Sequence, residues 1–161
     1  MGHIGVRHRI RLARPGVALP DATGTGQSEL EVTVRTATTG TAEFGLSQLT
    51  GNVPSALLVR DLNADGFNDV VSADYGDSTV SVHLGTGQGW LLPRQTVSVC
   101  AAPKDIAAED INGDLRPDLL LACSGDDKLG ILIASPSGGY LALGNLTSLG
   151  APSSLAVTDM D

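Results

Sequence analysis

The chain has 161 residues, a net charge of −8 and a sequence pI of about 4.6. This acidity argues against a nucleic-acid partner, because binding to phosphates needs a positive surface. No apolar run approaches the ~20 residues that span a bilayer, so no transmembrane segment is expected.

The first 27 residues are rich in Arg, Pro, Gly and Thr and lack clear periodicity. We expect residues 1–27 to form a loose basic segment, or one that is ordered only by docking. The segment has no apolar stretch of the kind found in a secretory signal. Residues 29–35 then alternate polar and apolar side chains, which predicts a strand.

One phrase occurs three times with a period of 49 residues, and this period indicates a repeat architecture. Each copy begins at a proline and reaches an aspartate seven residues later. The positions in register are Pro54, Pro103 and Pro152, and Asp61, Asp110 and Asp159.

Superposing the repeats predicts four short strands in each complete copy. The first covers 57–59, 106–108 and 155–157, the second 70–73 and 119–122, the third 80–84 and 129–133, and the fourth 95–99 and 140–146. Gly-rich turns separate them and no helical period is present. The pattern favours an all-β fold of four-stranded antiparallel β-propeller blades, with a parallel β-helix as the main alternative.

The units in this reading are a degenerate partial blade at 28–52, complete blades at 53–101 and 102–150, and the truncated start of another at 151–161. This amounts to a partial propeller of about three blades, whereas closed propellers have about 4–8. We therefore expect either a fragment of a longer propeller or chains that assemble into a ring.

An acidic loop joins the first two strands of each complete repeat. The pattern D-x-N-x-D places three side-chain oxygens on one side of a tight turn, a backbone carbonyl two residues later adds a fourth ligand, and a ninth-position aspartate closes the site. Oxygen ligands of this kind suit Ca²⁺. The predicted ligands are Asp61, Asn63, Asp65, the Phe67 carbonyl and Asp69, and then Asp110, Asn112, Asp114, the Arg116 carbonyl and Asp118.

The two loops are not equal, and neither is an EF-hand. An EF-hand needs a bidentate Glu at its twelfth position, where these loops have Ser72 and Leu121. Leu115 stands where the first loop has Gly66, so we expect the first loop to bind Ca²⁺ better. The alternative for each loop is a metal-free Asx-turn. The third loop, Asp159 to Asp161, holds only two candidate ligands.

The phrase P-x₆-D-x-N-x-D-G-x-x-D, followed by an apolar strand and then TVSVHLGTGQG, resembles FG-GAP/VCBS-type calcium-loop repeats, such as those of integrin α-subunits. The resemblance covers residues ~45–161. It implies a β-propeller, the same ten ligands, and a secreted or cell-surface protein that recognises a protein or glycan. Bound calcium would be structural.

Three alternatives remain open from the sequence. The chain could be a purely structural assembly module, or the propeller portion of a secreted carbohydrate-active enzyme, although we expect it to be non-catalytic because it has no nucleophile elbow and no metal–His cluster. Cys100 and Cys123 could be bridged, but a buried free thiol at Cys123 is at least as consistent with its apolar strand. Phe44, Trp90 and Tyr140 are interpreted as packing anchors, with sugar stacking by Trp90 as the alternative.

Overall fold

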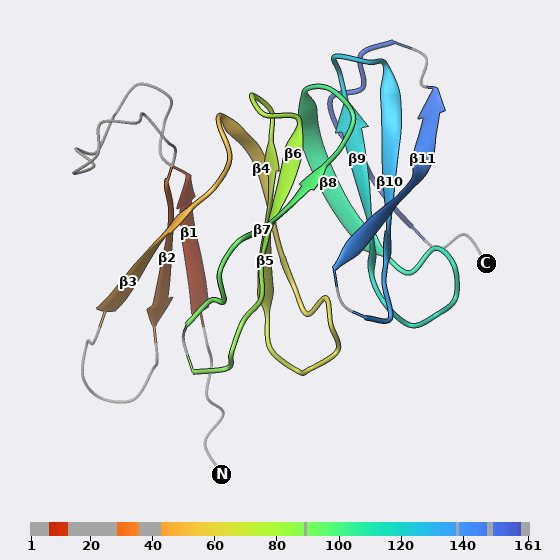
Figure 1. Ribbon diagram of the computed structural model, residues 1–161. Helices are drawn as coiled ribbons and strands as arrows, with labels where there is room; N and C mark the ends of the chain where they lie inside the picture. The colour runs from red at the N-terminus through yellow and green to blue at the C-terminus, as the bar shows by residue number, and fades with distance from the viewer. Residues whose placement is uncertain are drawn as a thin grey trace.

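The computed structural model describes residues 7–12, 29–35, 43–88, 90–137, 139–147 and 150–158, which form three antiparallel sheets standing side by side (Figure 1). No helix occurs in these residues. The strands are β1 (Arg7–Leu12), β2 (Glu29–Arg35), β3 (Glu43–Leu49), β4 (Pro54–Arg60), β5 (Asp69–Asp74), β6 (Thr79–His83), β7 (Gln95–Ser98), β8 (Pro103–Glu109), β9 (Asp118–Cys123), β10 (Lys128–Ala134) and β11 (Tyr140–Thr147).

The predicted four-stranded antiparallel blades are confirmed. One sheet has the order β4-β5-β6-β7 and the other β11-β10-β9-β8, so each strand pairs with its neighbour in the chain. The two sheets share one register: Arg60 pairs with Asp69 in the first, and Glu109 pairs with Asp118 in the second. The 49-residue period of the sequence is therefore a period of the structure.

The main core lies between the two four-stranded sheets, where β4 and β5 pack against β8. Alternation of apolar and polar side chains along the strands supplies the residues of this core, because every second residue of a strand points to the same face. The residues of this core are mainly aliphatic, which suits a sequence with only 3% aromatic residues. Its fully buried members include Val71, Ala73, Val80, Leu119 and Leu121.

The N-terminal sheet has three strands in the order β1-β2-β3. The strand predicted at 29–35 is confirmed as β2. Residues 7–12, which we expected in a loose segment, instead form β1 and pair with β2 along their whole length. The sequence Arg-His-Arg-Ile-Arg-Leu does alternate with a period of two, but its charges obscured that pattern.

Cys100 and Cys123 form a disulfide, with an S–S distance of 2.01 Å and a Cα–Cα distance of 5.8 Å. The interpretation of Cys123 as a free thiol is therefore wrong. The strand register explains the bridge. Pro103 pairs with Cys123, so the linker that precedes β8 runs beside the end of β9.

Residues 155–157, predicted as a first strand, lie in a segment without strand structure. A strand needs a neighbour to complete its hydrogen bonds, and no described residue pairs with this segment. None of the described residues forms a helix long and apolar enough to cross a membrane.

Candidate metal centre

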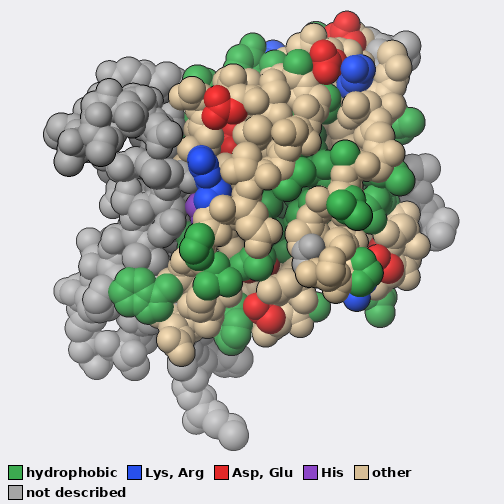
Figure 2. All heavy atoms as spheres, in the orientation of Figure 1, with side chains coloured by type: hydrophobic (Ala, Val, Ile, Leu, Met, Phe, Trp, Pro, Cys, Tyr) green, Lys and Arg blue, Asp and Glu red, His purple; other side chains and the backbone are tan. Residues whose placement is uncertain are grey.

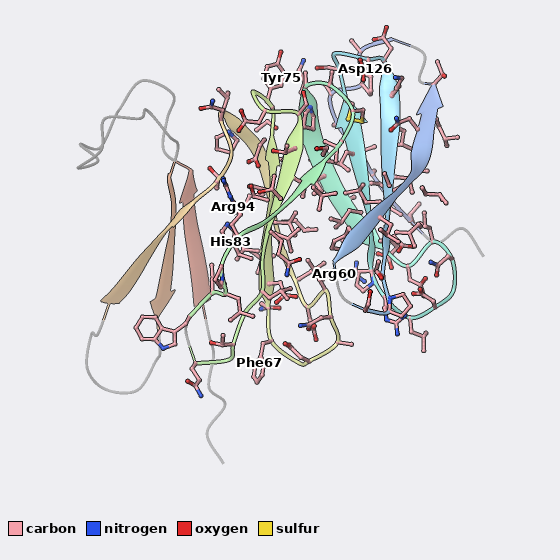
Figure 3. The ribbon with its side chains drawn as sticks, viewed as in Figure 1. Arg60, Phe67, Tyr75, His83, Arg94 and Asp126 are labelled. Atoms are coloured by element: carbon pink, nitrogen blue, oxygen red, sulfur yellow. A yellow bond between two sulfur atoms is a disulfide. The ribbon has the colours of Figure 1, made fainter. Side chains whose placement is uncertain are left out.

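The first acidic loop, residues 61–69, connects β4 to β5. Its residue Phe67 lies at the end of the sheet opposite to Tyr75 (Figure 3). The Asp61 carboxylate accepts the backbone N–H groups of Asp65 at 3.3 Å and Gly66 at 2.8 Å. Two left-handed residues make the tight turn, Ala64 with a φ of 61° and Gly66 with a φ of 86°. The loop thus folds around its first carboxylate.

The third and fifth positions of this loop also shape it. The side-chain oxygen of Asn63 accepts the N–H of Asp65 at 3.0 Å, and the Asp65 carboxylate accepts the N–H of Phe67 at 2.8 Å. The Asn63 amide donates to the other Asp65 oxygen at 2.9 Å. The three predicted side-chain ligands are therefore brought together by Asx-type hydrogen bonds.

Asp69, the predicted closing ligand, is fully buried and braces the loop. Its two carboxylate oxygens accept the N–H groups of Leu62 at 2.8 Å and Gly85 at 2.7 Å. Burial raises the pKa of Asp69, the two N–H donors partly oppose that rise, and the charges of Asp65 and Asp61 add to it. This role between the loop and the end of β6 was not predicted, while its role as a metal ligand stays a prediction.

The second loop, residues 110–118, lies between β8 and β9 and repeats these bonds with one further donor, the N–H of Gly113. Asp110 accepts the N–H groups of Gly113, Asp114 and Leu115 at 2.7, 3.2 and 2.7 Å. Burial by itself would raise the pKa of Asp110, but these backbone donors outweigh it and hold the pKa below its usual value.

Its remaining predicted ligands match their counterparts as well. Asn112 accepts the N–H of Asp114 at 2.9 Å, and Asp114 accepts the N–H of Arg116 at 2.9 Å. Asp118 is fully buried and accepts the N–H groups of Ile111 at 3.3 Å and Ala134 at 2.8 Å.

Glycine occupies different turn positions in the two loops. Leu115 adopts a φ of 65° where the first loop has Gly66, but Gly113 adopts a φ of 78° where the first loop has Ala64. Each loop therefore has one glycine and one strained residue in its two left-handed positions. Sequence comparison noted the loss of glycine at Leu115 and missed the compensation at Gly113.

Carboxylate, amide and carbonyl oxygens are the only donors that these loops offer, which is the donor chemistry of Ca²⁺ and not of zinc or copper. Within the described part of the chain, no group of three or more His, Cys, Asp or Glu side chains is arranged to hold a metal ion. Each loop gathers two acids and one amide at its rim, with its third acid turned inward. The third acidic pair, Asp159 and Asp161, lies outside the described residues.

Comparison with known proteins bears on this region. A family model described as an FG-GAP-like repeat matches residues 61–121, from the first residue of the first loop to β9. The chain resembles FG-GAP-type repeat proteins. Neither curated proteins nor solved structures gave a match.

The FG-GAP-like segment contains both loops, and a basic side chain distinguishes them. The Arg116 guanidinium lies 3.7 Å from the Asp114 carboxylate. The corresponding residue in the first loop is Phe67. Its ring lies so close to Gly87 that a Cβ atom added to Gly87 would come within 2.2 Å of a ring carbon. A cation therefore stands beside the ligand set of the second loop, whereas the first loop has at this position an apolar ring that lies close to Gly87.

The aromatic residues that we interpreted as packing anchors differ. Tyr140 fits that interpretation, because it is half-buried and its hydroxyl donates to the Pro117 carbonyl at 3.1 Å. Trp90 does not, since it is 54% exposed. The side chain of Phe44 lies outside the described residues.

Proposed function

We propose that this chain is a calcium-binding β-propeller repeat module in which Ca²⁺ is structural. One observation carries the proposal. Two nine-residue loops, 49 residues apart, join the first and second strands of two sheets and gather the same acid and amide side chains through the same backbone hydrogen bonds. A turn that arises once by chance has no reason to recur in register with its ligands kept.

Bound Ca²⁺ would supply positive charge to a rim that holds two carboxylates, of which only Asp114 in the second loop has a guanidinium, that of Arg116, within 4 Å among the described residues. In the first loop Asp61, Asn63 and Asp65 would provide side-chain oxygens, with the Phe67 carbonyl and Asp69 completing the set. In both loops the ion would tie the end of the first strand to the start of the second. The stability of each blade would then depend on Ca²⁺ by mass action.

The test is a thermal unfolding series with Ca²⁺ and with chelator. At about 100 times Kd, Ca²⁺ binding to one site adds about 2.7 kcal/mol, which raises Tm by about 5–11 °C for a chain of this size. Asp65→Asn and Asp114→Asn should each reduce the shift. Asp126→Asn is the matched control, because Asp126 lies at the other end of the sheets (Figure 3). An unchanged Tm in several millimolar Ca²⁺ would remove the metal from the proposal.

The proposed setting is outside the cell, in recognition or adhesion. The Cys100–Cys123 disulfide supports an oxidising compartment, since structural disulfides are rare in reducing ones. FG-GAP resemblance supports the same setting. A signal from a fluorescent fusion that remains inside the cytosol, with both cysteines reduced, would contradict it.

We further propose a non-catalytic role, with a protein or a glycan as the partner. The exposed indole of Trp90 supports a glycan, because sugar rings stack on exposed aromatic faces. A glycan array probed with the chain, with the Trp90→Ala variant and with chelator tests this choice. Binding that survives in the variant would exclude Trp90 as the stacking residue, and a wild-type chain that binds no glycan would favour a protein partner.

A further inference from the structure

The connection between β6 and β7 carries Trp90, and it reaches the same end of the sheet as the first acidic loop (Figure 1). We call residues 84–88 and 90–92 the Trp90 turn. The base of this turn is closed by the N–H of Leu92, which donates to the Leu84 carbonyl at 2.7 Å. Three consecutive residues of the turn connect it to the acidic loop and to the tryptophan.

Gly85 makes the first contact with the acidic loop. Its N–H donates to the buried carboxylate of Asp69 at 2.7 Å. The backbone lies so close to the loop that a Cβ atom added to Gly85 would come within 2.3 Å of the Asn68 carbonyl oxygen. Only glycine permits this approach, because every other residue has a Cβ atom. Asp69, the predicted closing ligand, is therefore bonded directly to the Trp90 turn.

Gly87 makes the second contact, because the ring of Phe67 occupies the space in which a Cβ atom of Gly87 would stand. Gly87 has a φ of 71°, in the left-handed region that glycine adopts without strain. The carbonyl of Phe67 is also one of the predicted calcium ligands. One residue of the loop thus offers its carbonyl to the metal site and its ring to the turn.

Thr86 lies between these two glycines and holds Trp90. Its N–H and its hydroxyl both donate to the Trp90 carbonyl, at 3.1 and 3.0 Å. The short segment 85–87 therefore contacts the acidic loop at both of its ends and fixes the backbone of Trp90 from its middle. The position of the indole depends on how this segment sits on the loop.

The loop and the turn also contribute exposed apolar side chains at the same end of the molecule. Phe67 and Leu92 are each 45% exposed, and the indole of Trp90 is exposed as well. Figure 2 shows hydrophobic side chains gathered over the β6–β7 connection. A shift of the loop would therefore change the surface that Trp90 presents to a partner.

The second acidic loop has no equivalent connection. It keeps one bond, from the N–H of Ala134 to Asp118 at 2.8 Å, which corresponds to the bond between Gly85 and Asp69. The ring and the indole are missing from its sequence. At positions 49 residues later, Phe67 is replaced by Arg116, Gly87 by Pro136 and Trp90 by Gly139. Both loops brace their own sheets, and the first loop alone is connected to a tryptophan.

We propose that the first acidic loop positions Trp90, so that Ca²⁺ bound in this loop controls recognition at the indole. This inference rests on the proposed calcium function. Asp69 and Phe67 would bind the ion through oxygen atoms, and the same two residues hold the turn at Gly85 and Gly87. A partner at Trp90 and Ca²⁺ in the loop would each strengthen the binding of the other, because coupling between two sites is reciprocal. Calcium in the second loop would be purely structural.

Trp90 reports on its own position, because it is the only tryptophan of the chain. The test is a Ca²⁺ titration of the whole chain, followed by tryptophan fluorescence anisotropy and by calorimetry. We expect a saturable rise in anisotropy that Asp114→Asn retains and Asp65→Asn loses. Heat of binding without a fluorescence response, or loss of the response in both variants, would overturn this inference alone. If no heat of binding is seen, the calcium function fails and this inference fails with it.

Two further variants separate the turn contact from calcium binding. Phe67→Ala removes the ring, and Gly87→Ala places a Cβ atom against it, while neither changes a side-chain ligand. Both variants should retain the heat of Ca²⁺ binding to the first loop and lose the rise in anisotropy. Phe67→Tyr keeps the ring and should retain the rise. A full rise in both Phe67→Ala and Gly87→Ala would overturn the proposal.

Gly139→Ala is the matched control for Gly87→Ala. Gly139 has a φ of 77°, so alanine is strained there to a similar degree. Its added Cβ atom would meet the Gln95 side chain at 3.6 Å, which is an ordinary contact. Gly139→Ala should therefore show the wild-type rise in anisotropy. Loss of the rise in this control as well would assign the effect of Gly87→Ala to backbone strain and would contradict the role of the Phe67 contact.

Discussion

The two four-stranded sheets fasten their entry linkers with different chemistry at equivalent positions. In the β8–β11 sheet Cys100 is bonded to Cys123. In the β4–β7 sheet, 49 residues earlier, Gly51 stands beside Asp74, whose fully buried carboxylate accepts the Gly51 N–H. We call each of these links a tie. One tie is a disulfide, and the other is a buried carboxylate with its hydrogen-bond donors.

A third position changes with each tie. Ser81 donates to Asp74 at 2.6 Å, and Ser72 donates at 2.9 Å. The equivalent of Ser81 is Gly130, where a Cβ would meet the Cys100 sulfur at 2.6 Å. A hydroxyl is needed beside the carboxylate, and empty space is needed beside the disulfide. Both sheets therefore have a tie at this point. The three residues that form the polar tie are replaced together by the three that form the disulfide tie.

Breaking the covalent tie should have the largest effect. Cys100→Ser with Cys123→Ser opens a loop of 23 residues and leaves hydroxyls in a buried site, so we expect a loss of about 3 kcal/mol in the free energy of unfolding. Urea denaturation measures it. Ser124→Ala, beside the disulfide, is the control and should cost under about 1 kcal/mol. Equal stabilities for the two variants would show that the disulfide is dispensable.

Breaking the polar tie should cost somewhat less. Asp74→Ala leaves the Gly51 N–H and the Ser81 and Ser72 hydroxyls without their acceptor, at a cost of about 2 kcal/mol. The same denaturation series gives the value. If the cost stays within about 0.5 kcal/mol, the level expected of a surface change, Asp74 is not the counterpart of the disulfide.

The polar tie should also respond to pH, and the covalent one should not. Burial raises the pKa of Asp74 above 3.8, and the Ser81, Ser72 and Gly51 donors only partly oppose the rise. The folded state thus binds the proton more strongly, so this contribution is present below pH 3.8 and is lost as pH rises through the folded pKa. Compared with wild type, Asp74→Asn should therefore gain relative stability as pH rises above 3.8.

Asp126→Asn is a control for which we expect the opposite dependence of stability on pH. The hydrogen bond from the Ala101 N–H, helped by Lys128, lowers the pKa of Asp126. Its contribution is present above pH 3.8 and is lost as pH falls through the lowered pKa. Asp126→Asn should therefore lose relative stability as pH rises. Parallel pH profiles for the two variants would contradict the assignment.

Sequence reasoning predicted the repeat and its strands because two-residue alternation is visible within a few neighbouring residues. The 49-residue period is visible when the sequence is aligned with itself. The disulfide was not predictable in this way, since it depends on the register that sets Pro103 beside Cys123. One signal was available: Cys100 and Cys123 align with Gly51 and Asp74, and an aspartate that ends an apolar strand needs a partner.

The candidate site was predicted in part for a similar reason. The spacing of Asp61, Asn63 and Asp65 fixes which side chains share a turn, and the structure gathers these three. The inward brace by Asp69 was missed because its donor at Gly85 is sixteen residues away along the chain. Likewise, β1 was missed because its edge charges hide its alternation.

Moving all three residues of the disulfide tie into the β4–β7 sheet would sharpen the comparison of the two ties. Gly51→Cys, Asp74→Cys and Ser81→Gly together transfer the covalent tie to the β4–β7 sheet. We expect a second disulfide, seen as a mass change on reduction, and a gain on the order of 1 kcal/mol. The double variant that keeps Ser81 should form less of the bridge, because the side chain crowds the sulfur. Equal bridging in both variants would show that the third position is independent.

The two acidic loops offer the finest comparison, because their seventh position changes from Phe67 to Arg116 and so from an apolar to a charged side chain. The Arg116 guanidinium, 3.7 Å from Asp114, competes with any cation that binds there. Its side chain is 40% exposed, so solvent screens the competition and its effect should be small. Under the proposed calcium function, Arg116→Gln should strengthen Ca²⁺ binding to the second loop by about 2–5-fold.

Calorimetric titration in an Asp65→Asn background isolates that loop. The reciprocal change, Phe67→Arg in an Asp114→Asn background, should weaken the first loop by a similar factor. Both effects should shrink at high salt, since they act through charge and not through packing. If Arg116→Gln lowers the affinity instead, the guanidinium orders the loop more than it repels the ion. The first loop would then owe its advantage to the turn at Gly66.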